Sequence, residues 1–411
     1  MEIIVQKFGG SVIKDLPAIE RVADIIVKSN TSKQKVVVVV SAMGDTTDNL
    51  LNLAQKINPN PVAREIDMLL TSGERITMAL LSLAIWHRGY EAISFTGSQV
   101  GIITDAQHTD ARIIEIKGSR LYEALEQNKI PIIAGFQGVS FNKEVTTLGR
   151  GGSDVTAVAI AAFLKAKRCE LYKDVLGVFA EDPKLFPSVK HIPQLSYEEM
   201  SELTTAGAEI LHPRACALAL KYKVPLVIKS LKKDNATMIN SDNLTKQHTE
   251  KAFVRAISHS TNLCRLSLVA VPQLPKCLHQ VVVRLAEAKI PLLFFAHGVP
   301  YHKKFDLSFI VTNANYPAAK AVLETAKKLV NAESLVEAKN LASISLIGPG
   351  IGSDVEIFSG LFETLHKLKI HTDAFISSEM KITCFLREEQ IKKAISALLK
   401  RFDLVTKSKL K

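Results

Sequence analysis

The stretch Val5-Gln6-Lys7-Phe8-Gly9-Gly10-Ser11 lies close to the first residue of the sequence, and the rest of the chain is organised around it. Residues 3–5 predict a short buried strand that the two glycines end, and Pro17 then opens a predicted helix. A glycine turn between strand and helix lets backbone N–H groups approach an anion, and the helix N-terminus adds its positive end. The stretch therefore favours a phosphate-binding turn with Lys7 beside it, and a plain turn is the alternative.

Length and composition set broad limits on the fold and its partners. The chain has 411 residues, 47% of them hydrophobic and 23% charged, which predicts two or three domains with sizeable cores. The net charge is +11, but the lysines are spread along the chain, and the aromatic residues (6%) are not interleaved with basic ones. We therefore expect small anionic ligands and no nucleic acid.

The cysteines and histidines indicate the cellular compartment of the protein and whether it holds a metal. The five cysteines are far apart and form no CxxC pair, which predicts reduced core thiols in a cytoplasmic protein. The histidines show no metal-ligand spacing, so no protein-held metal is expected. The longest apolar runs have the length of strands, so no membrane partner is expected either.

Two further buried strands are predicted to end at a ligand-binding edge. Residues 36–40 are an unbroken β-branched run, typical of a parallel strand covered on both faces, and Ser41 follows them. Residues 130–134 form a similar strand that ends in glycine. Open α/β sheets bind ligands at the carboxyl ends of their strands. The run 149–154 adds an arginine, glycine amides and the start of a helix at residue 155.

Six strings of the sequence resemble, in order, those of the amino acid kinase superfamily and, within it, the aspartokinases. They are KFGGS (7–11), SAMGDTTD (41–48), TSGER (71–75), SFTGSQ (94–99), GFQG (135–138) and TTLGRGGSD (146–154). The last string is the most specific. The resemblance covers most of the first 230 residues closely and the remainder loosely. It implies an α/β catalytic domain over residues 1–235, a three-layer αβα sandwich with a mainly parallel sheet.

The C-terminal part follows a different pattern. Residues 232–251 are polar and are interpreted as a linker, and residues 236–262 as linker and first strand. Two βαββαβ-like segments then resemble a tandem of ferredoxin-like ACT domains, at 263–335 and 340–405. In the family the first copy is inserted into the second, so residues 252–258 are expected to add a strand to the second domain.

A possible dinucleotide-binding turn in this region is rejected. Gly348-Pro349-Gly350-Ile351-Gly352 follows a predicted strand, but it lacks the GxGxxG spacing. Too little chain follows it for a doubly wound half or for a fused dehydrogenase domain.

The resemblance implies phosphorylation of the side-chain carboxylate of L-aspartate by ATP with Mg²⁺ carried by the nucleotide. This is the first step toward lysine, diaminopimelate, threonine and methionine. The acceptor carboxylate is already ionised at neutral pH, so no general base is needed. Catalysis of phosphoryl transfer is largely positioning and electrostatics. A lysine and glycine amides at the first turn suit that task.

The resemblance also assigns the site residues. Lys7 and Asp154 are implied to be catalytic, with a helix N-cap as the alternative role for Asp154. By periodicity alone Glu74 belongs on a solvated face of a helix (64–87, interrupted near Gly73), but the TSGER match places it at the aspartate. The ATP side is implied to comprise Lys7, Phe8, Gly9, Gly10, Ser11, Ser41, Lys173, Asp174, Phe179, Glu181, Asp182 and Lys184. The aspartate side is implied to comprise Thr47, Glu74, Arg150, Gly151, Gly152 and Ser153.

One position departs from the family pattern. Glu209 stands where aspartokinases commonly have a lysine near the nucleotide, and Lys173 and Lys184 are candidates to compensate. Two alternatives therefore stay open. The first alternative to an aspartate kinase is another amino acid kinase, acting on acetylglutamate, glutamate or a nucleotide, which would not share TSGER together with the ACT pair. The second, which Glu209 keeps open, is a catalytically weak amino-acid-binding regulatory subunit.

The regulatory loops also vary. ACT pairs bind amino acids, here lysine or threonine by resemblance, at a loop that often contains Pro-Gly before a helix. The first loop (271–276) has no glycine, and the second (348–354) lacks the Pro-Gly step before its helix. We expect the ACT pair mainly to form a homo-oligomer, with weak feedback inhibition. A variant loop that still binds its effector is the alternative.

Overall fold

The computed structural model describes residues 2–231, 235–241 and 252–406. The chain forms two compact units: Met1–Phe179 with His191–Glu250, and Ala180–Lys190 with Lys251–Lys411. Residues 180–190 thus belong with the C-terminal unit, although they lie inside the predicted catalytic domain.

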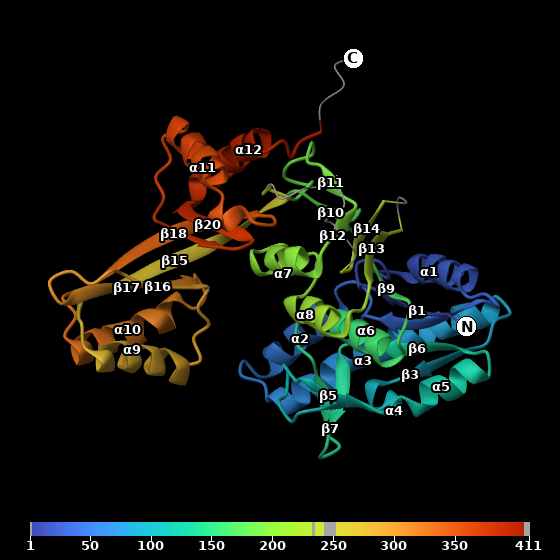
Figure 1. The fold of residues 1–411 in the computed structure, drawn as a ribbon. Coiled ribbons are helices and arrows are strands. Elements are labelled where there is room, and N and C mark those ends of the chain that lie inside the picture. The colour runs from blue at the N-terminus through green and yellow to red at the C-terminus, as the bar shows by residue number, and fades with distance from the viewer. Residues whose placement is uncertain (1, 232–234, 242–251, 407–411) are drawn as a thin grey trace. The chain divides into compact units, whose positions relative to one another are not determined.

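An eight-stranded sheet forms the centre of the first unit, in the order β12-β14-β13-β9-β1-β2-β6-β3 (Figure 1). The six strands from β13 to β3 run parallel, and β14 is antiparallel to β13. The strands are β1 (Glu2–Phe8), β2 (Gln34–Val40), β3 (Ala92–Phe95), β6 (Ile130–Ala134), β9 (Arg168–Lys173), β12 (Gln194–Leu195), β13 (Leu226–Ser230) and β14 (Ala236–Ile239). The mainly parallel sheet predicted from the sequence is confirmed. Residues 236–239, expected in a linker, instead form β14.

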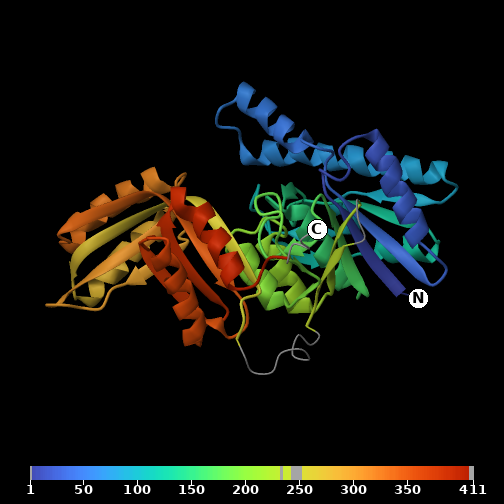
Figure 2. The ribbon, with the colours of Figure 1, turned by 90° about the horizontal axis from the view of Figure 1, so that it is seen from above.

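Helices cover both faces of this sheet, which confirms the three layers. The helices are α1 (Leu16–Ser29), α2 (Thr46–Ile57), α3 (Ala63–His87), α4 (Gly97–Val100), α5 (Ser119–Glu126), α6 (Gly152–Phe163), α7 (Tyr197–Thr205) and α8 (Pro213–Tyr222). The blue α1 and α3 lie on one face and α6 on the other (Figure 2). Side chains alternate along β1, so Ile4 and Phe8 pack with α1 and α3, while Lys7 points to the α6 face.

The predicted interruption of α3 is wrong, and Gly73 has a different role. The helix runs unbroken from Ala63 to His87. A Cβ atom on Gly73 would lie 2.8 Å from the Cβ atom of Ala42 and 3.3 Å from Cγ2 of Thr46. The glycine therefore lets α3 press against the loop after β2.

Among the described helices, α3 is also long and apolar enough, by length and composition, to cross a membrane. Half of its most apolar window is buried inside the protein, and it carries the buried carboxylates of Asp67 and Glu74. These are the features of a core helix.

Two smaller sheets complete the first unit. One has the order β5-β4-β7-β8, and the other pairs β10 with β11. Their strands are β4 (Ile102–Thr104), β5 (Ile113–Ile116), β7 (Gln137–Ser140), β8 (Val145–Thr147), β10 (Val178–Phe179) and β11 (His191–Ile192). β7 and β8 pair in antiparallel orientation and form a hairpin.

The second unit is built on one antiparallel sheet in the order β16-β17-β15-β18-β20-β19. The strands are β15 (Ala256–Pro272), β16 (Phe294–His297), β17 (Lys304–Thr312), β18 (Ser334–Ile347), β19 (Ala374–Ser378) and β20 (Lys381–Arg387). The helices are α9 (Pro275–Glu287), α10 (Tyr316–Val330), α11 (Val355–Lys367) and α12 (Ile391–Arg401). Within this unit, α9 and α10 lie on one side of the sheet and α11 and α12 on the other (Figure 1).

Two long strands, β15 and β18, run through both ferredoxin-like halves of this unit. The predicted boundaries, 263–335 and 340–405, instead divide the two halves near the start of β18. β15 pairs with β18 from Ala256↔Ile347 to Val269↔Ser334, with bulges between residues 260 and 265. The start of β15 therefore adds a strand to the second copy, as the inserted arrangement predicts.

Residues 180–190 are held to the second unit by both backbone and side chains. The Ile257 N–H donates to the Ala180 carbonyl (2.7 Å), and the Lys190 N–H donates to the Leu404 carbonyl (2.9 Å). Oε1 of Glu181 lies 3.1 Å from Nδ1 of His259, and this hydrogen bond raises the pKa of His259. Because of these contacts, residues 180–190 belong to the C-terminal unit.

Replacement of Gly73 tests the close contact of α3. Gly73→Ala should lower the free energy of unfolding by about 1–3 kcal/mol through overpacking, although alanine favours a helix by about 1 kcal/mol. Adding Ala42→Gly removes the facing methyl group and should restore part of the loss. Thermal unfolding measures both, with Ile76→Ala on the exposed side of α3 as the control. A Gly73→Ala protein as stable as the original would contradict the packing role.

Candidate functional site

The predicted site lies at the carboxyl edge of the parallel sheet. The last residues of β1, β2 and β6 are in register, as Phe8↔Val40 and Val40↔Ala134, and Phe8 also pairs with Tyr172 near the end of β9. The segments that follow these strands therefore meet at one edge.

The glycine turn after β1 is packed closely. A Cβ atom on Gly10 would lie 2.8 Å from the Ala42 carbonyl oxygen and 3.1 Å from that of Gly44, so only glycine fits there. The Gly9 N–H donates to the Tyr172 carbonyl at 3.2 Å and is not available to a ligand. Within the described part of the chain, the N–H groups of Gly10 and the exposed Ser11 donate no hydrogen bond.

Two lysines meet on one buried carboxylate at this edge. Nζ of Lys7, near the end of β1, lies 2.8 Å from Oδ1 of Asp154, and Nζ of Lys173, at the end of β9, lies 2.7 Å from Oδ2. All three side chains are largely buried. Burial acts to raise the pKa of Asp154, but the charges of Lys7 and Lys173 outweigh it and hold the pKa below its usual range. The cluster carries one positive charge in excess.

Asp154 is not the N-cap of α6, so that alternative is wrong. The N-cap is Gly151, with φ of 71°, and Asp154 lies in the first turn of the helix. A Cβ atom on Gly151 would lie 2.5 Å from that of His212, so glycine is required both by its conformation and by its neighbour.

Glu74 presents a buried carboxylate with one unpaired oxygen. Its side chain extends from α3 to the loop after β2, where Oε1 accepts a hydrogen bond from the Ala42 N–H at 3.1 Å. Oε2 is buried and has no partner among the described residues. Desolvation raises the pKa of Glu74 to about 7, against smaller lowering effects of hydrogen bonds and of Lys7. The group is suited to a cationic partner.

The other predicted aspartate-side residues flank this region. Arg150 is exposed and forms no ion pair within the described residues. Ser153 is the second residue of α6, after Gly152, and Thr47 lies half-buried in the first turn of α2.

The predicted nucleotide-binding residues are divided between the two units. Ser41 follows β2, Asp174 follows β9, and Phe179 on β10 lies edge-on to His191. Glu181, Asp182 and Lys184 belong to the second unit. Of the two lysines considered as compensation for Glu209, Lys173 is thus the one at the sheet edge. Glu209 itself is exposed in the loop between α7 and α8.

The structure brings four further polar residues to the segment before Arg150, and sequence reasoning missed them. Asp67, His108, Thr147 and Arg214 form a network around residues 147–149. The one available signal was the spacing of Asp67 and Glu74, which are two helical turns apart on α3.

Comparison with known proteins agrees with this site. Residues 2–230 match the model of the amino acid kinase family. The chain is 39% identical to an aspartokinase from Mycolicibacterium smegmatis, over 98% of this chain and 97% of that protein. It is 38% identical to an aspartokinase from Bacillus sp. (strain MGA3), over 98% of each. The chain belongs to the aspartokinase family.

Solved aspartokinase structures share the fold. A structure of E. coli aspartokinase III in complex with aspartate and ADP aligns with a TM-score of 0.81 at 21% identity, over 98% of this chain and 100% of that one. An aspartate kinase from Synechocystis aligns with a TM-score of 0.55 at 33% identity, over 100% of this chain and 70% of that one.

The charge balance at Asp154 gives a stability prediction. Asp154→Asn leaves two buried ammonium groups without their carboxylate and should lower the free energy of unfolding by roughly 3–5 kcal/mol. Adding Lys173→Met removes one of these charges and should recover part of that loss. Urea unfolding measures both variants. The control is Glu2→Gln, which breaks an exposed ion pair with Lys167 and should change little. A double variant no more stable than Asp154→Asn would refute the charge argument.

Proposed function

We propose that this chain transfers the γ-phosphoryl group of ATP to the side-chain carboxylate of L-aspartate, giving 4-phospho-L-aspartate and ADP. The single observation that carries the proposal is the buried carboxylate of Glu74 with its unpaired oxygen. It stands in the TSGER string, in a chain of the aspartokinase family with a lysine cluster at the same sheet edge. The five cysteines are free and buried, which supports a reducing, cytoplasmic setting.

On the phosphate side, Lys7 and Lys173 supply the charge. Their cluster with Asp154 has one positive charge in excess, which suits a polyphosphate. Asp154 holds both ammonium groups in place, and the Gly10 and Ser11 N–H groups complete the turn. Mg²⁺, arriving with ATP, would shield the phosphate charge, and no residue of this chain is assigned to hold it. We extend the ATP side by resemblance to Phe8, Gly9, Ser41, Asp174, Phe179, Glu181, Asp182 and Lys184. Gly9 would shape the turn and not donate its N–H group, which the Tyr172 carbonyl accepts.

On the aspartate side, Glu74 binds the α-ammonium group and Arg150 the α-carboxylate, with a bidentate geometry open to the guanidinium. Thr47 and Ser153 complete this side, with Gly151 and Gly152. An oxygen of the side-chain carboxylate attacks the γ-phosphorus. The bond from that phosphorus to the bridging oxygen breaks, and its electron pair leaves on ADP. No proton moves, because the attacking carboxylate is already ionised.

The two alternative functions have less support. Curated relatives that are 35–39% identical over 98% of this chain are named aspartokinase or aspartate kinase. Glu209 is the feature that kept the regulatory-subunit alternative open, and we propose that Lys173, which lies at the sheet edge, supplies the positive charge that Glu209 does not.

An ADP-release assay tests the proposed activity. Aspartate should give Mg²⁺- and ATP-dependent release of ADP, while glutamate, N-acetylglutamate and a nucleoside monophosphate should give little. Release with N-acetylglutamate or glutamate instead would support another amino acid kinase. No release with any substrate would support the regulatory-subunit alternative.

The raised pKa of Glu74 predicts a pH dependence. Above pH 7 the carboxylate is charged and binds the substrate ammonium group, and below pH 7 it becomes neutral. The kcat/KM for aspartate, which reports the free enzyme, should therefore fall about tenfold from pH 8 to pH 6. Glu74→Gln should have a low kcat/KM that is flat over this range. An unchanged pH profile in Glu74→Gln would show that another group titrates.

We also propose that the second unit forms a homo-oligomer and responds weakly to lysine or threonine. Asp354 caps α11 by accepting from the N–H groups of Glu356 and Ile357, so this helix N-terminus is already paired with an anion. A Cβ atom on Gly352 would lie 1.6 Å from the Ser378 carbonyl oxygen, so the glycine serves packing within the unit. The edge strand β19 exposes Phe375, which supports self-association.

Titration of lysine and threonine, alone and together, tests this proposal in the same assay. We expect less than half inhibition at sub-millimolar concentrations, because the α11 N-terminus is capped and the first loop has no glycine. Sedimentation of the full chain should show a species larger than a monomer. Strong inhibition at sub-millimolar lysine would contradict the proposal and show that the first loop closes without its glycine.

A further inference from the structure

Asp67 is a fully buried carboxylate that ties two separate segments to α3. Oδ1 accepts from the Thr147 hydroxyl at 2.5 Å, and both oxygens accept from the Thr109 N–H at 3.1 and 3.2 Å. Nδ1 of His108 lies 2.7 Å from Oδ2. Thr147 ends β8, whereas His108 and Thr109 lie in the loop 105–112. One carboxylate therefore joins a helix, a strand and a loop.

The loop 105–112 is held in a strained conformation at this point. Thr109 has φ of 67°, in the left-handed region that β-branched residues rarely adopt. Such a conformation persists only where the surroundings determine it. The paired hydrogen bonds of its N–H group to Asp67 are the contact that does so.

Both segments that Asp67 holds lie next to Arg150: β8 precedes it in the chain, and the loop 105–112 contacts the backbone just before it. The Ala111 N–H donates to the Thr147 carbonyl at 2.9 Å, which joins the loop to β8 three residues before Arg150. Gly149 lies against the same loop, since a Cβ atom there would be 2.9 Å from Oδ1 of Asp110. The backbone just before Arg150 is thus packed between Asp67 and this loop.

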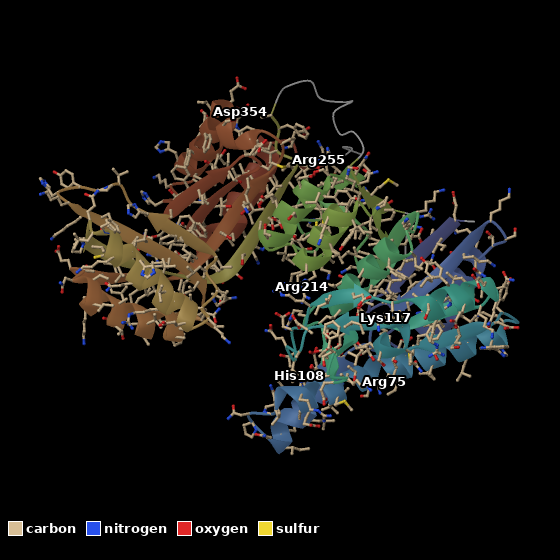
Figure 3. The ribbon with its side chains drawn as sticks, turned by 60° about the horizontal axis from the view of Figure 1, so that its bottom comes forward. Arg75, His108, Lys117, Arg214, Arg255 and Asp354 are labelled. Atoms are coloured by element: carbon tan, nitrogen blue, oxygen red, sulfur yellow. The ribbon has the colours of Figure 1, made fainter. Side chains whose placement is uncertain are left out.

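Arg214 closes the arrangement from the start of α8. Nη1 lies 2.8 Å from Oδ1 of Asp110 and 2.7 Å from the Leu148 carbonyl oxygen, and Nη2 donates to the Ala111 carbonyl at 2.8 Å. Figure 3 labels His108, which lies in this loop, and Arg214, which contacts the loop from α8 of the first unit. The guanidinium fork joins the loop to the Arg150 segment a second time.

The geometry points to Asp67 as a positioning residue for aspartate binding, with Arg214 as its support. Asp67 and Glu74 are two turns apart on α3 and both are buried. The helix thereby holds Glu74 directly and Arg150 through Asp67. It sets the separation between the group that meets the substrate ammonium and the group that meets its α-carboxylate. The inference rests on the proposed roles of Glu74 and Arg150.

This arrangement affects the two substrates differently. The ammonium and α-carboxylate of aspartate are a fixed distance apart, so a shifted Arg150 weakens aspartate binding. Lys7 and Lys173 belong to β1 and β9, which have no contact with Asp67 in the network described, so ATP binding should be insensitive. A defect that merely destabilised the unit would affect both.

The test is the kinetics of Asp67→Asn. An asparagine has one acceptor oxygen and cannot receive all three donors. We expect the KM for aspartate to rise about tenfold, with kcat and the KM for ATP within twofold of the original. Asp24→Asn, which breaks an exposed ion pair with Arg88 at the end of α3, is the matched control and should change none of these values.

Two further variants keep the inference testable if Asp67→Asn folds poorly. Arg214→Lys retains the charge but loses the fork, and should raise the KM for aspartate about threefold. In an Arg150→Ala background, Asp67→Asn should add nothing to the KM for aspartate, because Asp67 acts through Arg150.

The outcomes separate this inference from the proposed function. An unaltered protein without aspartate-dependent ADP release refutes the proposed function itself. With an active unaltered protein, equal effects of Asp67→Asn on both KM values, unchanged kinetics, or additive effects with Arg150→Ala would overturn the positioning role alone.

Discussion

Asp154 holds two buried ammonium groups on one carboxylate, and the surrounding structure follows from keeping this three-charge cluster stable. A lone buried lysine would be costly, so Lys7 and Lys173 each need the shared carboxylate. That requirement brings the first turn of α6 to the ends of β1 and β9, two neighbouring parallel strands. The excess positive charge then faces the segment where the Gly10 turn leaves its N–H group unbonded within the described residues. Anion affinity is thus a property of the fold as well as of single residues.

Glu74 is the electrostatic opposite of this cluster. It is a buried carboxylate whose Oε2 has no hydrogen-bond partner among the described residues, and desolvation raises its pKa. A folded protein keeps an incompletely paired buried acid at some cost to stability. A ligand with an ammonium group removes this cost on binding. The site therefore has an excess positive charge at the ends of β1 and β9 and an unpaired buried carboxylate oxygen, that of Glu74, on α3.

The sequence predicted those features that depend on short local patterns. The strand before Gly9, the buried run that ends at Val40 and the turn before α6 could all be predicted, because spacing and residue type determine them. The predicted interruption of α3 at Gly73 was wrong, because the sequence does not distinguish a glycine that breaks a helix from one that permits close packing. The network of Asp67 could not be predicted from the sequence, because its members come from two helices, a strand and a loop. Likewise nothing local showed that residues 180–190 pair with a distant strand.

The placement of residues 180–190 makes the two units interlaced along the chain. The chain passes from one unit to the other after Phe179, returns after Lys190, and passes over again after Glu250. A fragment that started at Met238 would leave the Ile257 N–H and the His259 ring without their partners at Ala180 and Glu181. The C-terminal unit is therefore not a self-contained module. Any recombination that exchanged C-terminal units between relatives would have to carry this internal segment with it.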